Sequence, residues 1–184
     1  MTNLSLPEKV VAIHEALAEL KIPHAIGGAL ALAYYAEPRA TADVDVNVFV
    51  PTERWPQVRD ALAPLGVDVK LNERALERDG QVRLRWDRNP VDLFFSYDPF
   101  HAAMRKAARR VPFADTTIPI LAPEHLVVCK AIFDRPKDWI DIEQVLVATD
   151  PLDLREIESW LEQMTAPDDH RHTKLAEIRS RLSR

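Results

Sequence analysis

The chain is poor in residues that mark several classes of protein. Of its 184 residues only one is a cysteine, Cys129, so no intramolecular disulfide can form, which fits a reducing cytoplasm. No apolar run approaches the roughly 20 residues of a membrane-spanning helix. The opening residues MTNLSLPEKV contain no basic segment followed by an apolar one. We therefore expect no signal peptide, a cytoplasmic location and no membrane partner.

An excess of positive charge is also lacking. The net charge is -5 at pH 7, which argues against a generally basic surface for nucleic acid. Local basic clusters are nevertheless there. One falls on a helix that we expect over residues 99–110, and it consists of Arg105, Lys106, Arg109 and Arg110. The other is in the tail: Arg171, Lys174, Arg179, Arg181 and Arg184. Either solvated helix faces or a track for a polyanion would explain them.

The hydrophobic pattern changes along the chain. Apolar spacing predicts helices over residues 5–20, 28–36, 53–65 and 99–110, and strands over 24–28, 43–50, 81–86, 91–95 and 117–121. After Pro123 only helices are predicted, over 124–133, 137–148, 153–165 and 169–182. We therefore expect an α/β (α+β) core in residues 1–122, followed by a helical part in residues 123–184 that shares its core.

Only four glycines occur, and two of them, Gly27 and Gly28, are adjacent. They lie between a predicted strand and a predicted helix. Amides at a helix N-terminus are free donors, and the helix dipole favours anions there. Because glycine has no Cβ, a phosphate can approach the backbone closely. The pair is therefore a candidate phosphate site, although a purely structural turn would have the same sequence.

Three aspartates stand in predicted strands. Asp43 and Asp45 are two residues apart, so their side chains point to one face of a strand. Their carboxylates repel each other, and a divalent cation such as Mg²⁺ would compensate them. Asp92 lies between Val91 and the apolar residues 93–95, where a charge needs a partner or a shifted pKa. The alternative is that Asp43 and Asp45 line a solvated strand face and that Asp92 caps a turn.

The order of these features resembles a known group. The run IGGALALAYYAEPRATADVDVNVFV resembles the signature of the DNA polymerase β-like nucleotidyltransferase superfamily, in particular the AbiEii and MenT type toxins. The toxin pattern Arg-x-Thr-x-Asp-x-Asp is matched by Arg39, Thr41, Asp43 and Asp45, and the third carboxylate by Asp92. The later run LAPEHLVVCKAIFDRPKDWIDIEQVL resembles the helical signature of that family, with Lys130, Asp138 and Asp141. The resemblance covers roughly residues 22–148.

This resemblance implies a fold and an activity. The fold would be a small mixed sheet flanked by helices, with a C-terminal helical extension. The enzyme would move a nucleoside monophosphate from an NTP to an acceptor hydroxyl and release pyrophosphate, with Mg²⁺ or Mn²⁺ held by the three carboxylates. The toxin branch implies a tRNA 3′ end as acceptor and a cognate antitoxin as partner. Two alternatives stay open: nucleotidylation of a small molecule, as in aminoglycoside-type enzymes, and a non-catalytic nucleotide-binding or antitoxin-like module.

The resemblance also assigns roles to residues outside the three carboxylates. Arg39, Thr41 and Lys130 would bind the nucleotide, with Arg39 and Lys130 on phosphate oxygens. Lys130 and Asp141 would belong to the active site. The residues themselves also allow simpler roles: a surface charge for Arg39 and a solvent-facing position for Lys130. For Asp141 the alternative is a helix-stabilising charge, since Asp138 is close to the start of the same helix, and the roles of these two aspartates stay open.

The glycine pair departs from the pattern of many superfamily members. Those have Gly-Ser in the turn, and the serine hydroxyl binds phosphate. Here Gly28 stands where that serine would be. Gly27 and Gly28 would therefore bind the nucleotide through their backbone.

Overall fold

The structure is a computed structural model that describes residues 4–182. The chain divides into two compact units. The first contains the residues up to Leu30 and Ala40–Leu121, and the second contains Ala31–Arg39 and the residues from Ala122 onward. The first unit holds a mixed sheet with its helices, and the second is helical. The expected fold class is thus confirmed.

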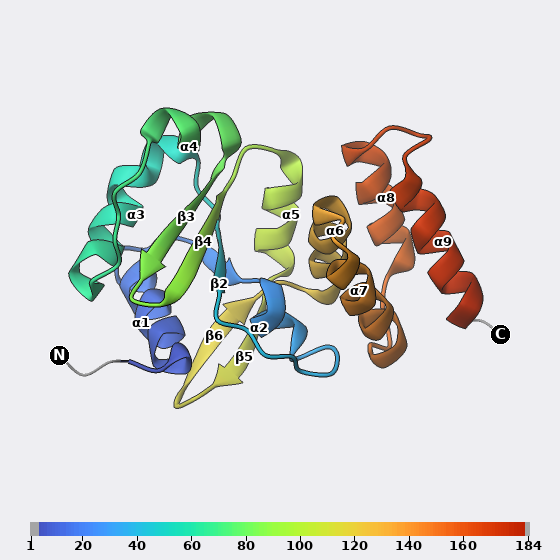
Figure 1. Ribbon diagram of the computed structural model, residues 1–184, viewed down its shortest axis with the longest axis horizontal. Helices are drawn as coiled ribbons and strands as arrows, with labels where there is room; N and C mark the ends of the chain where they lie inside the picture. The colour runs from blue at the N-terminus through green and yellow to red at the C-terminus, as the bar shows by residue number, and fades with distance from the viewer. Residues whose placement is uncertain (1–3, 183–184) are drawn as a thin grey trace. The chain divides into compact units, whose positions relative to one another are not determined.

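The sheet of the first unit has six strands in the order β3-β4-β2-β1-β6-β5 (Figure 1). Their bounds are β1 His24–Ile26, β2 Val44–Val48, β3 Gln81–Trp86, β4 Asn89–Phe95, β5 Arg109–Phe113 and β6 Thr116–Ile120. The pairs β2–β4 and β1–β6 are parallel, while β1–β2, β3–β4 and β5–β6 are antiparallel. The strands expected over residues 81–86 and 91–95 therefore form an antiparallel hairpin.

The apolar face of the sheet follows from the period of two along each strand. Fully buried side chains alternate along β2 and β4, namely Val44, Val46, Val48, Val91, Leu93 and Phe95. The ring of Phe95 meets the edge of Trp55, at the start of α3 (Trp55–Leu62), with centroids 6.4 Å apart. Helix α1 (Leu6–Glu19) packs beside α3 and buries Val10, Ile13 and Leu17. The opposite face of β2 and β4 carries Asp45, Asn47 and Asp92, with Phe94 beside Asn47.

Shorter elements complete the first unit. They are α2 (Gly28–Leu32), which continues into the second unit, and η1 (Thr52–Arg54), η2 (Ala63–Leu65), α4 (Glu73–Asp79) and α5 (Pro99–Ala107). Among them, α2 and α5 differ from the expected ranges. Helix α2 has five residues rather than the nine expected over 28–36. The β3–β4 turn is Asp87–Arg88, and Asn89 and Pro90 already belong to β4. Helix α5 ends at Ala107, so the expected helix over 99–110 is wrong in its last turn.

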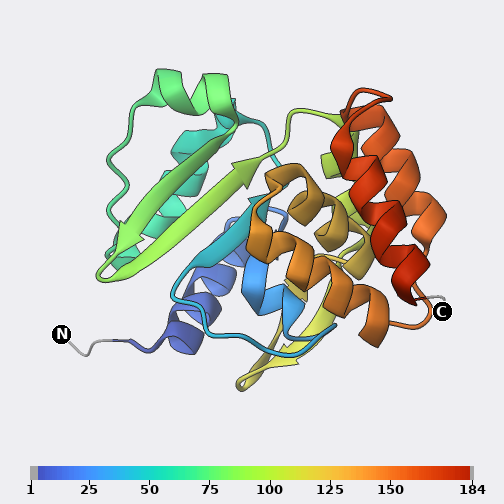
Figure 2. The same ribbon diagram turned by 45° about the vertical axis from the view of Figure 1, so that its right-hand side comes forward.

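The second unit is built from four helices within the described part of the chain, as the sequence predicted (Figure 2). They are α6 (Pro123–Phe133), α7 (Pro136–Ala148), α8 (Leu154–Met164) and α9 (His170–Leu182). Proline stands in the first turn of α6 and α7, where its missing N–H removes no bond. The side chain of Asp153 caps α8 by accepting hydrogen bonds from two backbone amides. Between residues 4 and 182, no helix has the length and apolarity needed to cross a membrane.

Candidate active site

A row of charged side chains crosses three neighbouring strands of the first unit. The parallel register of β2 and β4 pairs Asp45 with Asp92, and the antiparallel register of β3 and β4 pairs Arg83 with Asp92. Directly paired residues point to the same face of a sheet. Arg83, Asp92 and Asp45 therefore lie side by side on the face opposite the buried valines. Asp43, two residues before Asp45, lies at the entrance to β2.

Arg83 joins this row electrostatically. Its Nε donates to Asp92 Oδ1 at 2.7 Å, and its Nη2 donates to Asp92 Oδ2 at 2.6 Å. The same Nη2 is 4.0 Å from Asp43 Oδ2. The hydrogen bonds and then the charge of Asp92, followed by the charges of Asp43 and Asp45, raise the pKa of Arg83. The three predicted carboxylates thus act together on one guanidinium.

The donors in this row suit a divalent cation. Carboxylate oxygens are the ligands that Mg²⁺ and Mn²⁺ prefer. Asp45 and Asp92 supply them from paired strand positions, and Asp43 supplies them from the residue before β2. Among the described residues, however, no three acidic, histidine or cysteine side chains are already grouped as a metal site. Arg83 engages both oxygens of Asp92. The chemistry of the row therefore fits the metal, although Asp92 has to release Arg83 before it can act as a ligand.

The Gly27–Gly28 turn lies against Asp45. Gly27 N donates to Asp45 O at 2.9 Å, and Gly28 has φ +56. A Cβ on Gly28 would lie 1.8 Å from Asp45 Oδ2 and 2.5 Å from Asp45 Cγ. Glycine is therefore required here by the neighbouring carboxylate as well as by the backbone. A serine at position 28 would displace Asp45, which gives the departure from Gly-Ser a structural reason.

Thr41 orders the approach to β2. Its Oγ1 accepts a hydrogen bond from Asp43 N at 3.1 Å. This contact fixes the backbone of Asp43 one residue before the strand begins. In this structure Thr41 therefore supports a carboxylate of the row.

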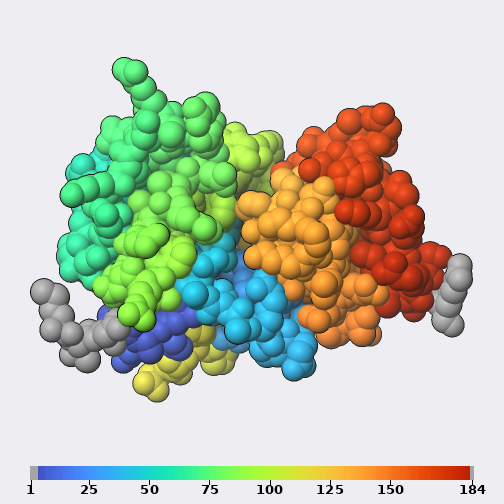
Figure 3. Space-filling model, in the orientation of Figure 1, coloured from blue at the N-terminus to red at the C-terminus, as the bar shows by residue number. Residues whose placement is uncertain are grey.

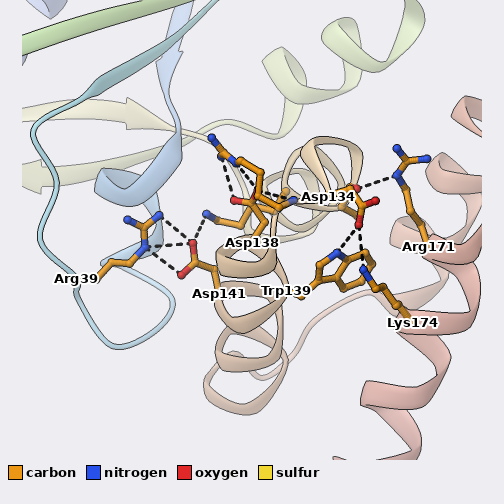
Figure 4. A network of polar contacts seen from close by, with 10 residues as sticks. Arg39, Asp134, Asp138, Trp139, Asp141, Arg171 and Lys174 are labelled. Atoms are coloured by element: carbon orange, nitrogen blue, oxygen red, sulfur yellow. Dashed lines mark hydrogen bonds and ion pairs between the residues drawn. The ribbon is translucent and has the colours of Figure 1, made fainter.

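In the second unit, Asp141 holds two cations at once (Figure 4). Arg39 Nε lies 3.0 Å from Asp141 Oδ1, Arg39 Nη2 lies 3.0 Å from Oδ2, and Lys130 Nζ lies 2.7 Å from Oδ2. Lys130 and Asp141 are buried, with 4% and 2% of their surface exposed, so Lys130 is not a solvent-facing residue. Burial by itself would raise the pKa of Asp141, but the hydrogen bonds from Arg39 and Lys130 outweigh it, and the pKa is lowered.

Asp138 and Asp141 have different surroundings although they lie one turn apart on α7. Asp138 is completely buried and accepts hydrogen bonds from the backbone N–H and the guanidinium of Arg135. These contacts close the first turn of α7 as a capping box. Asp138 thus stabilises the start of the helix, whereas Asp141 orients Arg39 and Lys130 (Figure 4).

Sequence reasoning missed Arg83. A signal existed, because QVRLRW alternates polar and apolar residues and pairs as a hairpin with the strand that carries Asp92. Antiparallel pairing places polar residues of the two strands on one face. What could not be read from the sequence was the register, which sets Arg83 rather than Arg85 opposite Asp92.

The expected basic stripe over residues 105–110 is wrong. Arg105 and Lys106 end α5, while Arg109 and Arg110 lie in β5, where successive side chains point to opposite faces. Arg110 donates to Thr117 across the β5–β6 hairpin. Four residues of the tail cluster lie on α9 and are ion-paired, namely Arg171, Lys174, Arg179 and Arg181. Arg184 lies outside the described residues.

Comparison with known proteins gives a result only at the level of structure. No family model matches the sequence, and no curated protein matches it. The lincomycin-bound structure of the lincosamide antibiotic adenylyltransferase LnuA is similar, with a TM-score of 0.56, 13% identity, and coverage of 80% of this chain and 100% of that one.

The antibiotic-resistance factor ANT(2″)-Ia is also similar, in two structures. In complex with adenylyl-2″-tobramycin it gives a TM-score of 0.56, 16% identity, and coverage of 95% of this chain and 97% of that one. Its solution structure gives a TM-score of 0.53, 17% identity, and coverage of 95% and 91%. At such identities the likeness concerns the fold. The chain therefore has the fold of nucleotidyltransferases.

Proposed function

We propose that this chain is a metal-dependent nucleotidyltransferase that moves a nucleoside monophosphate from an NTP to an acceptor hydroxyl. One observation carries the proposal: Asp45 and Asp92 are paired in register on neighbouring strands, with Asp43 two residues away, and Arg83 binds Asp92 and lies close to Asp43. Three carboxylates gathered on neighbouring strands are groups that a divalent cation would neutralise. The fold shared with the adenylyltransferase LnuA supports the same reaction.

The proposed reaction exchanges one bond at the α-phosphorus. The acceptor oxygen forms a bond to that phosphorus, the bond to the departing pyrophosphate oxygen breaks, and a carboxylate of the row takes the hydroxyl proton. Asp43, Asp45 and Asp92 would hold Mg²⁺ or Mn²⁺, which when bound neutralises phosphate charge and makes the hydroxyl more acidic. Catalysis of this kind depends mainly on positioning and charge, and the paired strands hold the carboxylates in place.

Nucleotide contacts follow from the remaining candidates. The Gly27–Gly28 turn offers backbone that a phosphate can approach, but Asp45 stands beside it, so a phosphate there needs a cation in between. Arg39 and Lys130 are candidates for phosphate contacts. Because Asp141 carries one charge against their two, one positive charge is left to attract an anion. The lone carboxylate also holds both cations in fixed positions, so less side-chain freedom is lost when a phosphate binds.

The favoured acceptor is a small hydroxylated molecule. The basic stripe that would have guided RNA is not formed, since Arg109 and Arg110 belong to a strand. The net charge of the chain is -5, which disfavours a polyanion. LnuA is bound to lincomycin, and the ANT(2″)-Ia complex contains adenylyl-2″-tobramycin. Those molecules belong to those proteins, and they suggest the class of acceptor to be tried first.

A tRNA 3′ end, with a cognate antitoxin as protein partner, is the second candidate. It rests on the toxin-like sequence pattern, whose two separate runs are joined by the contact between Arg39 and Asp141. Residues that are far apart in the sequence and share one ion pair are expected to act together. This contact favours a real resemblance to the toxin family over a chance match of either sequence segment alone.

A labelling experiment tests the proposal. The protein is incubated with each α-labelled NTP and Mg²⁺, with total RNA or a panel of aminoglycosides and lincosamides, and the labelled acceptor is resolved by gel or chromatography. We expect label in the small-molecule arm, and Asp45→Asn should lower the rate by about 100-fold or more, since it removes charge stabilisation at the reacting centre. Asp60→Asn on the exposed surface of α3 is the matched control. Equal rates for Asp45→Asn and the wild type would refute the proposed mechanism, whereas label in RNA alone would identify the second acceptor.

A further inference from the structure

Arg83 occupies the position where a cation is most needed. Its guanidinium grips both oxygens of Asp92 and lies 4.0 Å from Asp43 Oδ2. A bidentate arginine–carboxylate pair is the strong form of this contact. The three carboxylates carry like charges at close quarters, so without a neighbouring cation they would repel one another. Arg83 therefore keeps the row together when nothing else neutralises it.

The Arg83 side chain is placed so that it can move away from Asp92 into solvent. Strand β3 is at the edge of the sheet, and the β3–β4 hairpin lies at the surface of the first unit in the space-filling view (light green, Figure 3). The Arg83 side chain is 64% exposed, whereas that of Asp92 is 12% exposed. A guanidinium on a long flexible stem can turn into solvent with little loss of packing. Asp92, held in the middle of β4, cannot follow it.

A metal ion and Arg83 compete for the same atoms. Both oxygens of Asp92 accept from Arg83, and a cation bound there would also be repelled by the guanidinium a few ångströms away. Binding of one must therefore weaken binding of the other, and the coupling is reciprocal.

We propose that Arg83 is the resident counter-cation of the carboxylate row, holding Asp92 while the row is free of metal and leaving it when a divalent cation binds. This inference rests on the proposed function, because it assumes that the row is the metal site. It makes Arg83 a positioning residue that lowers the affinity for metal alone. A permanent structural ion pair is the competing explanation, and it predicts no coupling to metal.

The test measures metal binding and stability without any turnover. Mn²⁺ binding is measured without nucleotide for the wild type and for Arg83→Gln, Arg83→Lys and Arg85→Gln. Arg85 lies two residues along β3 on the same face, so Arg85→Gln is the matched control. Thermal unfolding of each protein is recorded in chelator and in saturating Mn²⁺.

Opposite shifts in the two measurements are the expected result. Arg83→Gln should bind Mn²⁺ roughly tenfold more tightly, since a charge-assisted contact that opposes metal binding is gone. It should unfold at a lower temperature than the wild type in chelator, and the gap should close in Mn²⁺. Arg83→Lys keeps the charge but loses the bidentate contact with Asp92, so its Mn²⁺ affinity and stability should fall between those of the wild type and Arg83→Gln. Arg85→Gln should match the wild type.

Two other outcomes would overturn the inference, and they separate it from the proposed function. Equal Mn²⁺ affinity of the wild type and Arg83→Gln, with the same stability gap in chelator and in metal, would make Arg83 a structural residue and leave the metal site standing. Absence of Mn²⁺ binding in all four proteins would remove both the inference and the metal-dependent function.

Discussion

Replacing Gly28 by alanine tests how tightly Asp45 is held against the Gly27–Gly28 turn. The added Cβ would stand 1.8 Å from Asp45 Oδ2, 2.5 Å from Cγ and 3.0 Å from Cβ. Two responses are open to the protein. The turn can shift, or the Asp45 side chain can rotate out of the carboxylate row. Either response disturbs the row, because rotation removes Asp45 as a ligand and a shift moves the backbone beside it.

The size of the effect can be worked from two contributions. A side chain at φ +56 costs about 1–2 kcal/mol in the left-handed region. Forcing an extra methyl into a filled space adds about 1–3 kcal/mol. Gly28→Ala should therefore lower the free energy of unfolding by roughly 2–5 kcal/mol if Asp45 stays in place. If Asp45 rotates away instead, the loss of stability is smaller and the loss of Mn²⁺ affinity is larger.

Urea unfolding and Mn²⁺ binding are therefore measured together. Gly66→Ala is the matched control, because Gly66 also has a left-handed backbone, at φ +91, but its nearest atom to a new Cβ is Trp86 Nε1 at 3.7 Å. In an Asp45→Ala background the two closest contacts of the new methyl are absent, so Gly28→Ala should destabilise less there. The reasoning is refuted if Gly28→Ala loses no more stability than Gly66→Ala and also binds Mn²⁺ like the wild type.

Two further predictions concern buried charge and pH. Asp141→Asn leaves Lys130 buried beside Arg39 without its carboxylate, so we expect about 3 kcal/mol of destabilisation in urea unfolding. Lys130→Met in the same background should recover part of it, and an Asp141→Asn variant as stable as the wild type would contradict this expectation. Burial lowers the pKa of His24 from 6.5 to about 4. Between these pH values His24 is therefore protonated in the unfolded chain and neutral in the folded one. The free energy of unfolding should fall by up to about 3 kcal/mol as the pH drops from 6.5 to 4. When it is measured at pH 7 and at pH 4.5, the difference between the two values should be smaller for His24→Gln than for the wild type.

Much of the secondary structure could be predicted from the local spacing of apolar residues. The alternation in residues 43–50 and 91–95 identified β2 and β4, and the spacing after Pro123 identified the four helices of the second unit. These features are local because the period of a strand or helix is a property of the backbone itself. The prediction of a helix over residues 99–110 was wrong in its last turn because it used local periodicity alone. Residues 109–113 pair with β6 as a strand, and that partner is tertiary context that overrides local propensity.

The sequence by itself predicted that Asp45 and Asp92 stand on strands, and it placed Asp43 on the strand of Asp45, whereas in the structure Asp43 lies one residue before β2. Only the tertiary structure decided that β4 lies beside β2 in the register that sets Asp92 against Asp45 and Arg83 against Asp92. It also decided that Lys130 is buried on Asp141 with Arg39. Register and partner depend on how distant segments pack together, and a shift of one residue would turn each side chain to the other face. That is why the candidate ligands could be found along the chain, while the cation that holds them could be found only in the fold.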